Sequence, residues 1–258
     1  MSNSTSKVCL EVRQLARAFG GTRALVDCSL TGRSGTVHAL LGENGSGKTT
    51  LVKILSGVLS PDSGQVIAGS ERISRFSPAA ARHRHGIATV FQELLNVPSR
   101  SVVDNIFLGE EFGIFHALSP AVRSERARSV LGWLGVDRVD LQAPLESLPL
   151  SVQQQVAIAR ALHREAQILI LDEATSALDV QAQERLFEVL REQVARGVFV
   201  LFITHRMNEI TNLADEVTVL RSGTTVAVVS RDEIRPERLL ELMSRVPAAA
   251  ATRADRDA

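Results

Sequence analysis

Hydrophobic residues along this chain occur in short runs that alternate with stretches of helical periodicity. The segments 37–41, 167–171 and 199–203 are almost entirely apolar, which is typical of strands buried on both faces of a parallel sheet. Further strands are predicted at residues 8–12, 66–68 and 87–91, with a final strand pair at 216–220 and 224–229. Helices are predicted to begin within residues 47–50 and to span 154–163, 181–196 and 236–246. This order predicts an α/β fold with a mainly parallel core sheet and an antiparallel β element.

Between residues 93 and 148 the strand signals disappear and helical signals replace them. Ser119 followed by Pro120 predicts a helix N-cap with proline at the first helical position. One apolar face then follows at i, i+3, i+4 and i+7, formed by Ala127, Val130, Leu131 and Leu134. We therefore predict a helical subdomain inserted at about residues 93–155 of the α/β domain.

Composition and charge limit the possible functions. The chain has 29 Lys and Arg residues against 29 Asp and Glu, so it lacks the overall basic field of a nucleic-acid-binding protein. Cys9 and Cys28 match no zinc spacing and are too few for a disulfide framework, which fits a reducing compartment. No apolar run approaches the roughly 18 residues of a membrane helix, so a membrane role requires a partner. We predict one domain at residues 1–247 and a disordered tail at 248–258.

A glycine-rich loop between a predicted strand and a predicted helix carries the clearest chemical signal. It has the form G-x-x-x-x-G-K-[ST] and reads Gly42-Glu43-Asn44-Gly45-Ser46-Gly47-Lys48-Thr49. Glycines let successive backbone N–H groups wrap around a phosphate, and the following helix aims its N-terminal dipole at the same anion. Lys48 is predicted to reach the outer phosphates and the Thr49 hydroxyl to bind Mg²⁺.

These residues, together with Thr50, are the predicted nucleotide-binding loop of a P-loop NTPase. A glycine-rich turn that matches by chance is the alternative, and the flanking strand and helix disfavour it.

The apolar strand at 167–171 ends in two carboxylates, Asp172 and Glu173. Such a strand directs its carboxyl end toward the ligand crevice of an open α/β sheet. Asp172 is predicted to hold Mg²⁺, directly or through water, and Glu173 to polarise the attacking water. A strand that merely meets acidic residues at a solvated helix start is the competing interpretation, and the phosphate loop disfavours it.

Together these motifs resemble the ABC (ATP-binding-cassette) ATPase family, in the family's order from about residue 8 to 229. Residues 171–179 are similar to its Walker B motif running into the D-loop. Gln92 is similar to the Q-loop glutamine that senses Mg²⁺, and His205 to the switch histidine that contacts the γ-phosphate or the attacking water. Phe19, before a Gly-Gly pair, resembles the aromatic residue that stacks on adenine. The resemblance implies ATP and Mg²⁺ binding, with hydrolysis at a dimer interface.

The family signature L-S-G-G-Q is degenerate here, where the chain reads Leu148-Pro149-Leu150-Ser151-Val152. Alignment without gaps puts Pro149 on the signature serine, whereas a short deletion makes Ser151 that serine. Neither alignment supplies the paired glycine amides. In this family two cassettes pack head to tail, so each ATP lies between one P-loop and the other signature. The resemblance therefore implies an asymmetric pair with a second cassette, expected on a different chain.

The segments Asn105-Ile106-Phe107-Leu108-Gly109-Glu110 and 204–210 resemble the monosaccharide-importer branch. This branch implies an ATP-hydrolysing subunit at the cytoplasmic face of the cell membrane, which energises import of sugars or similar small solutes. Its expected partners are transmembrane permease subunits, a solute-binding protein and the second cassette, with no nucleic acid. Members usually join two cassettes in one chain, so this chain is expected to be a split half or a relative that pairs with a separate cassette.

Two alternatives remain. A weakly hydrolysing regulatory cassette would explain the signature, although Glu173 and His205 argue against it. A non-transport ABC ATPase would carry a second cassette, or a coiled coil or zinc module between Gln92 and Leu148.

Overall fold

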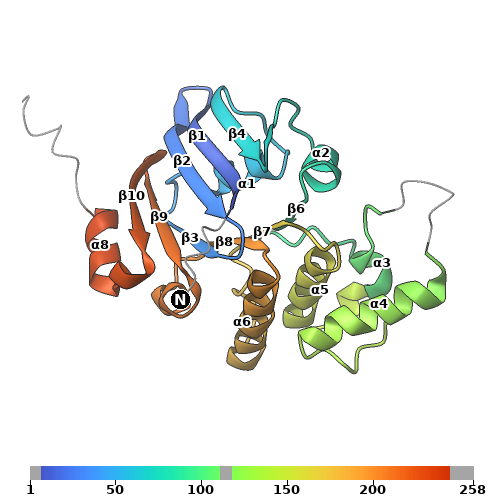
Figure 1. Ribbon diagram of the computed structural model, residues 1–258. Helices are drawn as coiled ribbons and strands as arrows, with labels where there is room; N and C mark the ends of the chain where they lie inside the picture. The colour runs from blue at the N-terminus through green and yellow to red at the C-terminus, as the bar shows by residue number, and fades with distance from the viewer. Residues whose placement is uncertain (1–6, 111–117, 245–258) are drawn as a thin grey trace, which may run out of the picture.

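The computed structural model describes residues 7–110 and 118–244. Within them, ten strands form one continuous sheet in the order β5-β4-β1-β2-β10-β9-β3-β8-β7-β6 (Figure 1). The predicted tail at 248–258 lies outside the described residues.

The core of the sheet is parallel, as predicted. It comprises β3 (Val37–Leu41), β6 (Ile87–Val90), β7 (Ile168–Asp172), β8 (Phe199–Ile203) and β9 (Glu216–Arg221). Every residue of β3, β7 and β8 is buried, which explains why these strands are apolar throughout rather than alternating. β10 (Thr224–Ser230) runs antiparallel to β9, and the two strands form the predicted pair.

An antiparallel layer extends the sheet and was only partly predicted. It is formed by β1 (Val8–Phe19), β2 (Thr22–Arg33), β4 (Ser63–Ala68) and β5 (Glu71–Arg72). The prediction ended the first strand at residue 12 and omitted β2. Register shifts interrupt the β1–β2 ladder at several points, and Gln14 has a positive φ of 47°. Such bulges break the alternation that identifies a half-buried strand.

Helices cover both faces of the parallel strands. α1 (Lys48–Leu55) packs on one face with the antiparallel layer, and α5 (Leu150–Leu162) and α6 (Val180–Ala195) pack on the other (Figure 1). α5 begins at Leu150, earlier than the predicted residue 154. Three short or terminal helices complete this part: α2 (Pro78–His83), α7 (Met207–Leu213) and α8 (Pro236–Ser244). The prediction omitted α2 and α7, which are too short to show helical periodicity.

The predicted insertion is helical, with α3 (Val102–Ile106), α4 (Pro120–Trp133) and the 3₁₀ turn Leu145–Ser147. The Ser119 side chain caps α4 by accepting a hydrogen bond from the Val122 N–H at 3.4 Å, as its N-cap position predicts. The predicted apolar face of this helix is buried in the same core as α5 and α6. The insertion therefore shares a core with the α/β domain.

Truncating this shared face should weaken the fold. Leu131→Ala removes a side chain that is 0% exposed, so we expect a loss of about 2–5 kcal/mol in the free energy of unfolding. The control Arg128→Ala, on the exposed side of the same helix, should stay within about 0.5 kcal/mol. Urea unfolding of both variants measures the difference, and equal midpoints would contradict the packing described.

Candidate functional site

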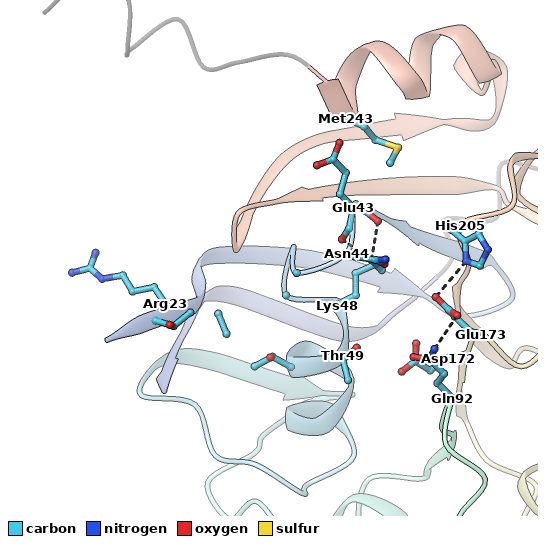
Figure 2. Close-up of a pocket in the computed structure, with 16 residues that line it drawn as sticks. Arg23, Glu43, Asn44, Lys48, Thr49, Gln92, Asp172, Glu173, His205 and Met243 are labelled. Carbon is cyan, nitrogen blue, oxygen red and sulfur yellow. Dashed lines mark hydrogen bonds and ion pairs between the residues drawn. The ribbon is translucent and has the colours of Figure 1, made fainter. Parts of the chain in front are cut away.

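An open cavity of about 700 Å³ lies where β3, β7 and β8 end (Figure 2), a volume within the usual range for ligand pockets. It is lined by Thr22, Arg23, Ala24, Gly42, Glu43, Asn44, Gly45, Gly47, Lys48, Thr49, Thr50, Gln92, Asp172, Glu173, His205 and Met243. The fold thus brings together all the predicted site residues except Phe19 and Ser46. These segments are far apart in the sequence and meet only in the folded chain.

The glycine-rich loop has the geometry of a phosphate cradle. Gly45 has a φ of 81°, and apart from its own chain neighbours no described residue has an atom within 4 Å of the position that a Cβ would occupy there. Gly47 has a φ of 107°, and its Cβ would collide with the Ala24 carbonyl oxygen on β2. The first N–H groups of α1 have no acceptor within their own helix. They lie at the N-terminal end of α1, whose first residues line the cavity. The loop therefore presents backbone donors to an anion.

Lys48 supplies the positive charge of this cradle. Its side chain is largely buried, and its Nζ donates to the carbonyl oxygens of Gly42 at 2.8 Å and Glu43 at 2.9 Å (Figure 2). Burial lowers the pKa of Lys48, and the negative charges of Glu173 and Asp172 oppose that effect. The ammonium group therefore sits between the loop carbonyls and the acidic pair.

Asp172 and Glu173 follow the end of the buried strand β7. Asp172 is only 3% exposed, and burial raises its pKa to about 6; the Glu173 charge adds to the rise, while Lys48 and Lys53 oppose it. A nearby cation stabilises the charged form of a buried carboxyl group of this kind. Its oxygens and the Thr49 hydroxyl fit the all-oxygen ligand set of Mg²⁺, which retains waters and takes further ligands from substrate phosphates.

Glu173 lies between two predicted site residues. Gln92 Nε2 donates to Glu173 Oε2 at 3.2 Å, and His205 Nδ1 lies 3.4 Å from Glu173 Oε1 (Figure 2). The Glu173 backbone has a φ of 48°, a conformation that costs a residue with a Cβ roughly 1–3 kcal/mol. Its N–H donates to the Ile203 carbonyl at the end of β8. The strained backbone is thus held by the neighbouring strand, and the carboxyl group is held by Gln92 and His205.

Two predicted residues lie outside the cavity lining. Ser46 is buried, and its Oγ has no hydrogen-bond partner among the described residues, so it contributes backbone to the loop. Phe19 ends β1 with 44% of its surface exposed, and the Arg17 guanidinium lies 5.1 Å from its ring centroid. The adenine-stacking role of Phe19 stays a prediction.

Four lining residues were missed by the sequence analysis. Thr22, Arg23 and Ala24 come from the unpredicted strand β2, and Met243 comes from α8 near the described end of the chain. No motif spacing marks these residues; only a correct prediction of the β1–β2 hairpin would have placed the first three near the glycine-rich loop.

The degenerate signature segment begins α5. Pro149 is the N-cap of this helix and provides no side-chain cap, and Leu150 is 61% exposed. Ser151 and Val152 line a separate cavity of about 650 Å³ with Asp179, the N-cap of α6, and residues of that helix. The segment therefore has a residue without a backbone N–H at the helix N-cap and an exposed apolar side chain at the first helical position.

A parallel sheet with a phosphate loop and two acidic residues at its carboxyl edge defines a P-loop nucleotide-binding domain. Comparison with known families places it more closely: the family model described as "ABC transporter" matches residues 25–176. The chain belongs to this family and is one of its ATP-binding domains.

Similar proteins agree with this assignment. Ribose import ATP-binding protein RbsA 1 of Mesorhizobium japonicum is 40% identical over 233 residues, which cover 90% of this chain and 45% of that protein. Ribose import ATP-binding protein RbsA of Hahella chejuensis is 40% identical over 242 residues, which cover 91% and 46%. The chain thus spans about half the length of the curated relatives it matches.

Solved structures share the fold. The cbiO1 protein of Clostridium perfringens, part of the ABC transporter complex cbiONQ, has a TM-score of 0.75 at 27% identity, covering 91% of this chain and 93% of that one. A dimeric bacterial ABC transporter cassette has a TM-score of 0.79 at 24% identity, covering 86% and 98%. None of the helices in the described part of this chain has the length and apolarity needed to cross a membrane.

Removal of the Lys48 charge should weaken nucleotide binding. Lys48→Ala leaves the loop amides in place, so we expect MgATP affinity to fall by about 10- to 100-fold, the usual loss for a hydrogen bond to a charged group. Lys53→Ala, which removes an exposed lysine from the same helix, is the control. Titration calorimetry measures both affinities, and a Lys48→Ala affinity equal to that of the control would contradict the site.

Proposed function

We propose that this chain binds MgATP in the cavity and hydrolyses it as the ATP-binding subunit of an ABC importer for sugars or similar small solutes. The observation that carries the proposal is the convergence of Lys48, Asp172, Glu173, Gln92 and His205 at one edge of the sheet. The names of the ribose-import relatives support the substrate class. The proposed cassette covers residues 1–247, with the helical insertion at about 93–155, and acts at the cytoplasmic face of the membrane through a permease.

The proposed role of each residue rests on its position in the cavity. The loop from Gly42 to Thr50 holds the phosphates with backbone N–H groups, and Lys48 faces their outer oxygens. Thr49, Asp172 and Gln92 are the proposed residues around Mg²⁺, which when bound offsets charge on the transferring phosphate.

Glu173 is the group that receives a hydrogen bond from the attacking water. Because Gln92 and His205 both contact its carboxyl group, they are positioned to adjust its orientation as the nucleotide binds.

A groove beside Gln92 suits contact with the permease. Phe91 and Glu93, the neighbours of Gln92 in the chain, line a cavity of about 190 Å³ together with Leu95 and Arg160. Arg160 donates to the Leu95 carbonyl at 2.8 Å, and burial together with the Arg164 charge lowers its pKa to about 10. A partner seated in this groove would touch the chain on both sides of Gln92, which links its movement to the nucleotide cavity.

The substrate class has a direct test. Purification of the chain from its native membranes, with its partners attached, should recover transmembrane permease subunits and a solute-binding protein that binds a monosaccharide. Mass spectrometry identifies the subunits, and recovery of a ribosomal or DNA-bound assembly would contradict the transport role.

Glu173→Gln should separate binding from hydrolysis. The substitution keeps the shape of the side chain and removes the base, so MgATP should still bind while turnover falls by roughly 10²- to 10⁴-fold. His205→Ala should show the same separation to a smaller degree. Glu192→Gln, at a carboxyl group exposed on α6, is the control. A parallel loss of binding and turnover in Glu173→Gln would make Glu173 a structural residue instead.

The signature segment supports an asymmetric pair. In a homodimer, each of the two ATP molecules would face the N-terminus of α5 from one copy of the chain, with its Pro149 and Leu150. A different cassette with an intact L-S-G-G-Q-like motif would complete the site that contains this chain's P-loop. The proposal holds whether the second cassette lies on another chain, as we expect, or further along the same one.

We therefore expect slow ATP hydrolysis by the purified chain and a large gain when the partner cassette and permease are added. The physical reason is that each missing preorganised donor to the phosphate costs about 3 kcal/mol in the transition state. A triple variant with Pro149→Ser, Leu150→Gly and Ser151→Gly should hydrolyse ATP faster than the unmodified chain alone. Fast, cooperative hydrolysis by the unmodified homodimer would end this part of the proposal.

The same degenerate segment also favours a second candidate, a weakly hydrolysing regulatory cassette. Glu173→Gln in the assembled complex distinguishes the two. A loss of most of the complex's turnover supports the hydrolytic role, whereas a small loss supports the regulatory one.

A further inference from the structure

Glu209 lies entirely in the interior, at the start of α7, and is not among the residues that line the candidate nucleotide cavity. It is 0% exposed, although burial of a charged group costs several kcal/mol unless partners compensate. Its Oε2 accepts a hydrogen bond from the Thr204 hydroxyl at 2.5 Å, and its Oε1 accepts one from Arg206 Nη1 at 3.3 Å. Its two partners are the residues on either side of His205.

These contacts form a continuous latch around His205. The Arg206 N–H donates to Thr204 Oγ1 at 3.1 Å, and the same hydroxyl donates onward to Glu209. The Glu209 N–H in turn donates to the Arg206 carbonyl at 3.1 Å. In a capping box, the glutamate at the third position of a helix accepts a hydrogen bond directly from the N-cap N–H. Here Thr204 stands between the two groups and ties the backbone before and after His205 to one buried carboxyl group.

The imidazole itself has little else to hold it. The His205 side chain is 64% exposed, and its Nδ1 lies 3.4 Å from Glu173 Oε1. The latch fixes the backbone from which this ring projects. The position of that backbone determines which side-chain rotamers can bring the ring within reach of Glu173.

We propose that Glu209 is a positioning residue, which acts through Thr204 and Arg206 to hold the His205 imidazole against Glu173 for hydrolysis. This inference rests on the proposed function, in which His205 serves the hydrolytic step. Misplacement of a reacting group by about 1 Å typically reduces turnover by about 10²-fold. Loss of the latch should therefore reduce turnover measurably.

The first test observes the imidazole without hydrolysis. The Cε1–H resonance of His205, identified by its loss in His205→Ala, is recorded by proton–carbon NMR in the full chain. Thr204→Val removes the hydroxyl and Glu209→Gln removes the charge, so both should shift and broaden this resonance. Thr211→Val is the matched control, since among the described residues its hydroxyl donates only to the carbonyls of Met207 and Asn208 in the same helix. An unchanged His205 resonance in both test variants would overturn the positioning role, even if the protein is an ATPase.

The second test measures turnover. We expect Thr204→Val to lower kcat by roughly 10- to 100-fold, with MgATP affinity unchanged within about threefold because the phosphate loop is untouched. Thr204→Ser, which restores a hydroxyl, should recover most of the loss, and Glu209→Gln should fall between them. In the His205→Ala background neither substitution should reduce turnover further, because the latch acts through that ring. Additive losses in that background, or a matching fall in affinity, would mark Glu209 as a general structural residue.

The two tests distinguish failure of the catalytic assignment of His205 from failure of the positioning role of Glu209. If His205→Ala itself leaves turnover intact, the catalytic assignment of His205 fails, and the NMR arm still decides whether Glu209 positions the ring. Since Glu209→Gln can also destabilise the fold, the thermal midpoint of each variant is compared with that of Thr211→Val. If the Glu209→Gln variant does not fold, the test relies on the isosteric variant Thr204→Val.

Discussion

The site depends on the parallel pairing of β8 with β3 on one side and β7 on the other. The register pairs Leu40 of β3 with Ile203, and Asp172 of β7 with the same Ile203. Parallel strands end at one edge, so the loop after β3, the acidic pair after β7 and the histidine after β8 emerge side by side. A slip of one residue in either pairing would turn the buried side chains to the opposite face and separate these groups.

This arrangement concentrates opposing charges in a partly buried place. Lys48 is largely buried beside Asp172 and Glu173, and burial shifts the pKa of the lysine downward and that of Asp172 upward. Both shifts express the cost of holding charge away from water, which phosphate and a metal ion would offset. The left-handed backbone at Glu173 adds strain, which hydrogen bonding to the end of β8 holds in place. The site therefore stores unfavourable interactions that its proposed ligands relieve, as is common where function and stability compete.

The N-termini of α1 and α5 differ in the charges and hydrogen-bond donors that they present. The N-terminus of α1 is open to an anion, with glycines that leave its N–H groups accessible and a lysine that adds charge. The N-terminus of α5 also carries a partial positive charge, but Pro149 before it has no backbone N–H, and the helix begins with the exposed side chain of Leu150. The two helix N-termini therefore differ in the donors and side chains around them.

The sequence alone determined the parallel core and most of the candidate site. Apolar runs without alternation identify strands buried on both faces, and the spacing of the 42–49 loop, Asp172 and His205 relative to those strands is local information. The bulged β1–β2 hairpin was decided by tertiary structure, because its irregular register hides the period-two pattern. Packing against that hairpin and α8 brought Arg23 and Met243 into the cavity. The role proposed for Glu209 also depends on the fold, since only burial and the positions of Thr204 and Arg206 distinguish its carboxyl group from an ordinary charge in the first turn of a helix.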